Sequence, residues 1–441
     1  MTKYTKVLLG AVSFAALATV AHAADPVVVV DVPAGYNWSG LYIGAGIGVG
    51  AVVHDVSVNN LGGVTGFIDS VSLNGIGGEG VFGELTIGYD YMVSPRFLIG
   101  AFADAHFGNI GPELDGGDLI NANLENKYGF DVGGRVGYLF NPTTLGYALA
   151  GYTWQRFELD GSLFGGAVPF DFEEDRDGYV VGVGMETVLG GAWTLKTEYR
   201  YANYGDETVF TFEDEDGDVD IDVEPSVHTF LLGVNYKFGA DNGGGAPIET
   251  PAYSWTGFYV GVAGAAGAAV TELSIDGGSL DGIGGEGVRG EINAGYDYDF
   301  GNFVAGIMVD AHYGNGKSEL ELDFGLGSLN FDAKADYGFD ILARAGMKVN
   351  ESTLAYVLGG YSWQNFEVEA SATGAGSEDI AEWDVDGFSI GGGLETAVTA
   401  NMTVGFEYRY TQFEDADLDL DGLDVETSMQ TARITAKYKF N

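Results

Sequence analysis

The residues from Trp193 to Tyr201 alternate between two kinds of side chain. The odd positions hold Trp193, Leu195, Thr197, Tyr199 and Tyr201, and the even positions hold Thr194, Lys196, Glu198 and Arg200. Because successive side chains of a β-strand point to opposite faces, one face is mainly apolar and aromatic while the other is largely charged. The segment 402–410 repeats this pattern. Such a strand fits a soluble sandwich or a tilted strand that crosses a bilayer with aromatic residues near its ends.

The first residues form an export signal. Lys3 and Lys6 precede the apolar run 7–20, and Ala21-His22-Ala23 is a small-x-small cleavage pattern. Residues 1–23 are therefore predicted to be a signal peptide, which leaves Ala24 as the first residue of the mature chain. Beyond this leader we find no stretch of about eighteen apolar residues that would form a transmembrane helix. The mature protein is then either soluble outside the inner membrane or a β-barrel that spans a membrane.

Composition narrows the possible partners. The chain carries 65 acidic residues against 19 Lys and Arg, a formal net charge of -46. This excludes nucleic acid as a natural partner, because binding phosphates requires a basic surface. Cysteine is absent, so neither disulfides nor thiolate chemistry are available. With 46% hydrophobic residues the chain is not disordered, since disorder also requires low hydrophobicity.

The chain contains two copies of one unit. Segment 38–44, Trp-Ser-Gly-Leu-Tyr-Ile-Gly, returns at 255–261 as Trp-Thr-Gly-Phe-Tyr-Val-Gly, and the glycine-rich segment 75–81 returns unchanged at 282–288. The closing Tyr-Lys-Phe of 236–238 returns at 438–440. A repeat of about two hundred residues indicates duplication of a whole domain. The predicted divisions are a signal peptide (1–23), a lead-in (24–37), a first barrel repeat (38–239), a linker (240–253) and a second barrel repeat (254–441).

Loop lengths in the first copy alternate between short and long. Eight strands are predicted near 38–53, 79–92, 97–108, 126–140, 145–159, 178–190, 192–205 and 226–238. Tight turns join them near 92–96, 141–143 and 190–192, and long loops lie near 54–78, 109–125, 160–177 and 206–225. Short turns at one end and long loops at the other are typical of an outer-membrane barrel, with the short turns periplasmic. We therefore predict an all-β fold, a transmembrane antiparallel β-barrel: two tandem eight-stranded barrels, or alternatively one sixteen-stranded barrel.

These motifs together resemble a known family. The Trp-x-Gly-x-Tyr opening, the Gly-Tyr-Asp-Tyr strand at 88–91 and 295–298, and the Tyr-Lys-Phe close are similar to OmpA-like outer-membrane β-barrels, in particular the RopB-type surface proteins of alphaproteobacteria. The resemblance covers each copy from end to end. It implies an eight-stranded barrel integral to the cell outer membrane, with four surface loops and no enzymatic role. The tandem duplication departs from the family, which usually has one barrel per chain.

Charged residues of both signs fall on the faces predicted to point into the barrel. The predicted interior network consists of Glu84, Asp104, Asp131, Arg135, Glu186, Lys196, Glu198 and Arg200 in the first copy, and of Glu291, Asp310, Asp340, Arg344, Glu395, Glu407, Arg409 and Arg433 in the second. An eight-stranded barrel is just wide enough to be filled by side chains, so these charges fit a packed salt-bridge core. The alternative is a gated, narrow ion path.

Two patterns are candidates for binding or catalysis. Asp104 and His106 share one strand face, but no inward serine accompanies them in both copies, which favours paired structural residues over a catalytic site. The acidic run with Asp417, Asp419 and Asp421 resembles the start of an EF-hand, yet Ser428 stands where that loop needs glutamate, so these three residues are weak metal candidates.

The sequence therefore predicts a non-catalytic protein without a cofactor, whose barrels hold acidic surface loops. Its role would be structural in the envelope or interaction at the surface; the alternative is a porin-like channel for small solutes formed by all sixteen strands. Predicted partners are outer-membrane lipid and lipopolysaccharide, with divalent cations or a host ligand at the loops.

Overall fold

The computed structural model describes residues 36–65, 67–117, 119–213, 218–240, 248–275, 278–415 and 423–440. The predicted signal peptide and Ala24 lie outside these ranges. The first half contains β1 (Gly40–Asn59), the short helix α2 (Gly62–Thr65), β2 (Ser70–Met92), β3 (Phe97–Ile110), β4 (Glu113–Asp115), β5 (Ile120–Asn141), β6 (Thr144–Leu163), β7 (Val168–Gly190), β8 (Trp193–Asn203), β9 (Glu207–Phe212) and β10 (Val219–Lys237). The second half contains β11 (Gly257–Ile275), β12 (Gly278–Asp299), β13 (Phe303–Asp323), β14 (Ser328–Asn350), β15 (Thr353–Ala372), β16 (Ser377–Ala397), β17 (Met402–Phe413) and β18 (Leu423–Lys439).

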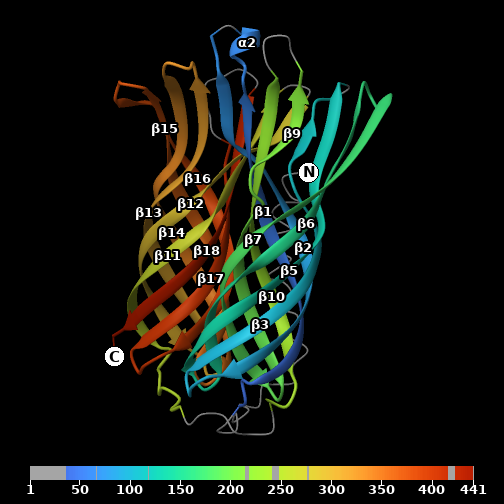
Figure 1. Ribbon diagram of the computed structural model, residues 1–441. Helices are drawn as coiled ribbons and strands as arrows, with labels where there is room; N and C mark the ends of the chain where they lie inside the picture. The colour runs from blue at the N-terminus through green and yellow to red at the C-terminus, as the bar shows by residue number, and fades with distance from the viewer. Residues whose placement is uncertain are drawn as a thin grey trace.

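Each half closes into its own antiparallel barrel. Strand β1 pairs with β2 on one edge and with β10 on the other, and β11 pairs with β12 and β18 in the same way. The opening strand thus meets the closing strand, as in the pairs Tyr42–Lys237 and Tyr259–Lys439. Figure 1 shows the first barrel in blue to green beside the second in yellow to red. Because both edges of β1, β10, β11 and β18 are occupied within their own halves, the alternative of one sixteen-stranded barrel is wrong.

The strand centres agree with the prediction, but several strands extend into the segments predicted as loops. Residues 70–78, predicted as loop, belong to β2, and β6 and β7 continue to Leu163 and from Val168. The physical reason is that backbone hydrogen bonding propagates along a hairpin even where its side chains become polar and acidic. The four long connections of the first barrel are therefore mainly extended hairpins. We call this the hairpin end, and the opposite end, with the tight turns, the turn end.

The barrels expose their apolar side chains and bury their charges. Exposed outward residues of β2 and β3 include Leu85, Ile87, Tyr89 and Ile99. Aromatic pairs border this belt: Phe130 stacks on Trp154 toward the hairpin end, and Trp193 meets Tyr236 edge-on at the turn end. Apolar bands between two aromatic girdles are characteristic of transmembrane barrels. No helix among the described residues is both long and apolar enough to span a bilayer.

The two barrels contact each other about a pseudo-two-fold axis. At the hairpin end the repeated glycine-rich segments meet, and Ile76 of β2 pairs with Ile283 of β12. A Cβ atom added at Gly75 would lie 2.0 Å from the carbonyl oxygen of Gly284, and one added at Gly282 would lie 2.1 Å from that of Gly77. Only glycine allows this approach in both directions. The unchanged repetition of this segment in the sequence is therefore explained by one interface that uses both copies.

Side chains on either side of this contact follow the same symmetry. Glu286 of the second barrel accepts hydrogen bonds from Ser226 (2.8 Å) and lies 2.8 Å from Nε2 of His228 in the first. Glu79 of the first barrel in turn accepts from Ser428 (2.6 Å) and Gln430 (3.0 Å).

Further toward the turn end the two barrels also touch through aromatic and hydroxyl groups. Phe230 stacks on Tyr408 with ring centroids 4.6 Å apart. Beyond it the equivalent residues Thr144 and Thr353 lie 2.8 Å apart, hydroxyl to hydroxyl. The interface thus runs from one end of the barrels to the other.

Candidate functional site: the charged barrel interiors

A first charged layer lies near the turn end of each barrel. In the first barrel, Arg135 donates through Nε to Asp90 (2.9 Å) and through Nη1 to Glu186 (3.1 Å), while Lys237 also binds Asp90. In the second, Arg344 donates to Asp297 (2.9 and 2.8 Å) and Glu395 (2.7 Å). Both arginines also lie over tyrosine rings; the Arg135 guanidinium is 4.6 Å from the ring centre of Tyr42. We call each of these groups a turn-end layer.

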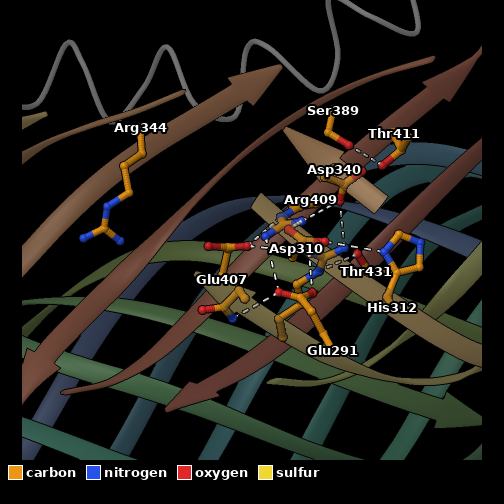
Figure 2. A network of polar contacts seen from close by, with 12 residues as sticks. Glu291, Asp310, His312, Asp340, Arg344, Ser389, Glu407, Arg409, Thr411 and Thr431 are labelled. Atoms are coloured by element: carbon orange, nitrogen blue, oxygen red, sulfur yellow. Dashed lines mark hydrogen bonds and ion pairs between the residues drawn. The ribbon is translucent and has the colours of Figure 1, made fainter. Parts of the chain in front are cut away.

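Above each layer one arginine gathers several carboxylates, and we call this group the hub. In the second barrel, Arg409 donates to Glu407 (2.6 Å), Asp310 (2.7 Å) and Asp340 (2.6 Å). Figure 2 shows these side chains converging from separate strands around the guanidinium, with Arg344 set apart. In the first barrel, Arg200 makes the equivalent bonds to Glu198 (2.7 Å), Asp104 (2.8 Å) and Asp131 (2.7 Å).

A fourth carboxylate in each hub is bound by a different cation in the two copies. Lys196 of β8 donates to Glu84 (2.9 Å) in the first barrel. Its counterpart in β17 is Gly405, and Arg433 of β18 donates to Glu291 (2.9 Å) instead. The cation that pairs with this carboxylate thus lies on β8 in the first barrel and on β18 in the second. A buried carboxylate needs such a partner, which explains why the loss of one cation is matched by the gain of another.

The structure brings all sixteen predicted interior residues into these layers and hubs, and each is buried. Further partners lie on the same inward strand faces. Asp90, Asp297, Lys237 and Lys437 complete the turn-end layers, as does Lys439, 3.7 Å from Asp297. Inward tyrosines, which were not predicted, also take part: Tyr147 donates to Glu198 (2.6 Å) and Tyr356 to Glu407 (2.7 Å). The sequence signal for these tyrosines is their position on the strand: a tyrosine on the same inward face as polar residues needs a hydrogen-bond acceptor.

The Asp-x-His pairs are bound into the hubs. Ligand atoms of Asp104, His106 and Asp131, and of the equivalent residues of the second barrel, lie within 4.8 Å of one another, close enough for a metal ion. The carboxylates, however, already accept hydrogen bonds from Arg200 or Arg409. The imidazole Nε2 of His106 lies 2.7 Å from Gln155 Oε1. A cation there would compete with a guanidinium, which favours the structural role. Asp417, Asp419 and Asp421 lie outside the described residues.

Sequence comparison assigns the family. The model of the outer membrane protein beta-barrel domain matches residues 8–238 and again residues 244–440. The chain belongs to this outer-membrane β-barrel family. Two copies of its domain account for nearly the whole chain, and the protein is integral to the outer membrane.

Curated relatives match one copy of the domain. A 31 kDa outer-membrane immunogenic protein of Brucella melitensis is 28% identical over 215 residues, which cover 44% of this chain and 87% of the relative. A 22 kDa outer membrane protein of Rhizobium leguminosarum is 30% identical over 176 residues, 40% of this chain and 72% of the relative. This outer-membrane barrel protein therefore carries two domains where each of these relatives matches one.

Solved structures give weaker likenesses. Neisserial surface protein A has 18% identity and a TM-score of 0.26, with 42% of this chain and 98% of that chain covered. The toluene transporter TodX of Pseudomonas putida has 10% identity and a TM-score of 0.27, with 94% of each chain covered.

Proposed function

We propose that this outer-membrane protein is a non-conducting, non-catalytic pair of barrels that anchors an acidic surface. The observation that carries the proposal is the filled interior. Each lumen is crossed by a turn-end layer and a hub, and each of the two central arginines donates hydrogen bonds to three different carboxylates. An ion that crossed the barrel would have to displace these buried pairs, whose rupture costs several kcal/mol.

The extended hairpins supply the acidic surface. Carboxylates stand directly opposite one another across the strands, as in the cross-strand pairs Glu158–Glu173 and Asp160–Asp171. The second barrel has the comparable pairs Glu367–Glu382 and Glu369–Asp379. Like charges opposite each other destabilise a hairpin. Their repetition favours a role in which the hairpins meet cations, either divalent ions shared with lipopolysaccharide phosphates or a basic patch on a ligand.

Acidic residues also crowd the seam between the barrels. Asp55 of β1 lies directly across from Glu224 of β10. At this hairpin-end position, burial, together with the nearby carboxylates of Glu286, Glu224 and Glu319, raises the pKa of Asp55 to about 7. The Brucella relatives are named as immunogenic outer-membrane proteins, which supports exposure of such hairpins at the cell surface.

Planar-bilayer recording of the refolded protein tests the non-conducting interior. We expect no steady opening for the unmodified chain. The double variant Arg344→Ala with Arg135→Ala, which removes the arginine from both turn-end layers, should leak or flicker, and the surface variant Arg156→Ala should behave as the unmodified protein does. A large and steady conductance of the unmodified protein would overturn the proposal in favour of a porin-like channel.

The acidic surface has a separate test. Thermal unfolding is compared in lipopolysaccharide bilayers and in neutral phospholipid, with and without Mg²⁺. We expect Mg²⁺ to stabilise the protein more in lipopolysaccharide, and we expect Glu367→Gln with Glu369→Gln to reduce that gain. An equal effect of Mg²⁺ in both lipids contradicts a bridging role for the hairpins.

A further inference from the structure

The hairpin-end interior of the second barrel is hollow. A cavity of about 230 Å³ lies there, above the Arg409 hub, and His312 and Thr431 contribute to its lining. The equivalent region of the first barrel encloses only about 40 Å³. The two copies share their fold and their hubs, so the difference must come from particular side chains.

Four positions in this region differ in size or charge between the two barrels. Alignment of the repeated motifs places Val52, Phe82, Ile110 and Leu124 of the first barrel opposite Ala269, Arg289, Gly316 and Ala333 of the second. In the first barrel Val52 and Ile110 are buried in one apolar cluster, and Phe82 and Leu124 pack against it. In the second barrel all four replacements line the cavity. Three of them are smaller, and the fourth replaces a phenyl ring with a guanidinium.

Arg289 faces this cavity without a carboxylate partner. Arg289 donates a hydrogen bond from Nη2 to the sulfur of Met429 at 3.3 Å, and within the described ranges it forms no ion pair. The nearest hub carboxylates are already taken: Arg433 binds Glu291 at 2.9 Å, and Arg409 binds Asp340 at 2.6 Å. A guanidinium that is removed from water and left unpaired is costly, whereas one that meets an anion forms strong, bidentate hydrogen bonds.

The remaining walls of the cavity are mainly apolar, and Glu286, Lys317 and Asp336 also line it. Phe366 of β15 and Trp383 of β16 stack with ring centroids 5.7 Å apart, and Met429 packs in the same cluster. A cavity of about 150 Å³ accepts benzene, and pockets for drug-sized ligands span about 300–1,000 Å³. The observed volume thus fits a ligand slightly larger than one aromatic ring.

We propose that the second barrel binds a small apolar monocarboxylate of about the size of benzoate. Arg289 would pair with the carboxylate, and the ring would lie among Phe366, Trp383 and Met429. Because the Arg409 hub fills the lumen beneath it, the site is a blind pocket rather than a passage. The first barrel, with Phe82 and Ile110 in the corresponding places, lacks both the room and the charge.

The experiment uses the full chain refolded in a non-ionic detergent. Saturation-transfer NMR and titration calorimetry measure the binding of benzoate, with benzamide as a neutral ligand of the same shape. The variants are Arg289→Gln, which removes the charge, and Gly316→Ile, which restores the residue of the first barrel. A Cβ atom at Gly316 meets nothing closer than the backbone oxygen of Glu286 at 4.0 Å, so the Cβ atom of isoleucine meets no steric obstacle. Arg156→Gln, in the first barrel, removes one positive charge elsewhere.

We expect saturable binding of benzoate and at least tenfold weaker binding of benzamide. Arg289→Gln should weaken benzoate binding at least tenfold, which corresponds to about 1.4 kcal/mol. Gly316→Ile should abolish it, and Arg156→Gln should leave it unchanged. Heat-modifiable migration on a gel confirms that each variant has folded. Absence of saturable binding by the unmodified chain, or binding by Arg289→Gln or by Gly316→Ile that is as strong as that of the unmodified chain, overturns the proposal.

Discussion

Removal of Arg200 is the sharpest test of the packed interior. This guanidinium donates hydrogen bonds to Glu198, Asp104 and Asp131 at 2.7–2.8 Å, and its Nη2 lies 3.0 Å from Glu84. In Arg200→Ala, Glu84 keeps Lys196 at 2.9 Å and Glu198 keeps the hydroxyl of Tyr147. Asp104 and Asp131 lose their arginine, and Asp104 keeps the imidazole of His106 at 3.6 Å, within ion-pair distance.

The expected loss of free energy of unfolding follows from the contacts that these carboxylates keep in Arg200→Ala. Breaking a buried pair by removing one partner typically costs about 3–5 kcal/mol, because the other charge stays buried without compensation. Two carboxylates are stranded here, so we expect the upper part of that range. Arg156 behaves differently because it pairs with Asp175 on the hairpin surface, where ion pairs add little to stability, so Arg156→Ala should change the free energy of unfolding far less than Arg200→Ala does.

Because the natural chain has no cysteine, a single label can report on one barrel. Ala167→Cys and Ala375→Cys place a fluorophore in equivalent exposed hairpin turns of the first and second barrels. Urea unfolding of Arg200→Ala in lipid vesicles should shift strongly for the label in the first barrel and less for the label in the second. A shift no larger than that of Arg156→Ala would refute the packed interior and place Arg200 in water.

Three further outcomes follow from the interface and from barrel closure. Residues 24–245 with a C-terminal Phe should refold alone into a heat-modifiable, protease-resistant monomer, since β1 already pairs with β10; a requirement for the second copy would contradict independent closure. Gly284→Val places a Cβ atom 2.9 Å from Cα of Gly77 in the other barrel, which is a steric clash. The variant should therefore lengthen the distance between spin labels at Ala167→Cys and Ala375→Cys. An unchanged distance would show that this contact does not hold the barrels together. The pKa of Asp55 is raised from 3.8 to about 7. Over this interval the folded state retains a proton that the unfolded chain releases, so the free energy of unfolding should fall as the pH rises. Asp55→Asn should flatten this pH dependence, as measured by urea midpoints below and above pH 7.

The barrel architecture was predictable because a strand that crosses a bilayer places apolar side chains toward lipid at every second position. In β1, Leu41, Ile43 and Ile47 point outward and the alternate positions point inward, so a period of two identifies both faces. The interior hubs followed for the same reason: charges on an inward face must meet. The exact partners did not follow, because they join strands far apart in the chain, as Arg200 joins Asp104, and the tilt and register that decide them are not local properties.

The interface between the barrels could not be derived from one strand at a time. The identical segments 75–81 and 282–288 are visible in the sequence as a repeat. Their actual role depends on two copies that meet around an axis, where Gly75 approaches Gly284 and Gly282 approaches Gly77. A backbone contact of this kind leaves no hydrophobic pattern in the sequence, only glycines that do not change.

Joining two copies in one chain changes what each copy is free to do. In a dimer of identical barrels, every substitution appears on both sides of the axis, so a residue that hollows one lumen hollows the other. In the fused pair, the shared contacts can stay symmetric while the interiors diverge. This combination is observed here: Glu79 and Glu286 make equivalent bonds across the axis, while Phe82 fills one barrel and Arg289 lines a cavity in the other. The first barrel keeps a filled interior, and the second is free to bind a ligand without loss of the interface.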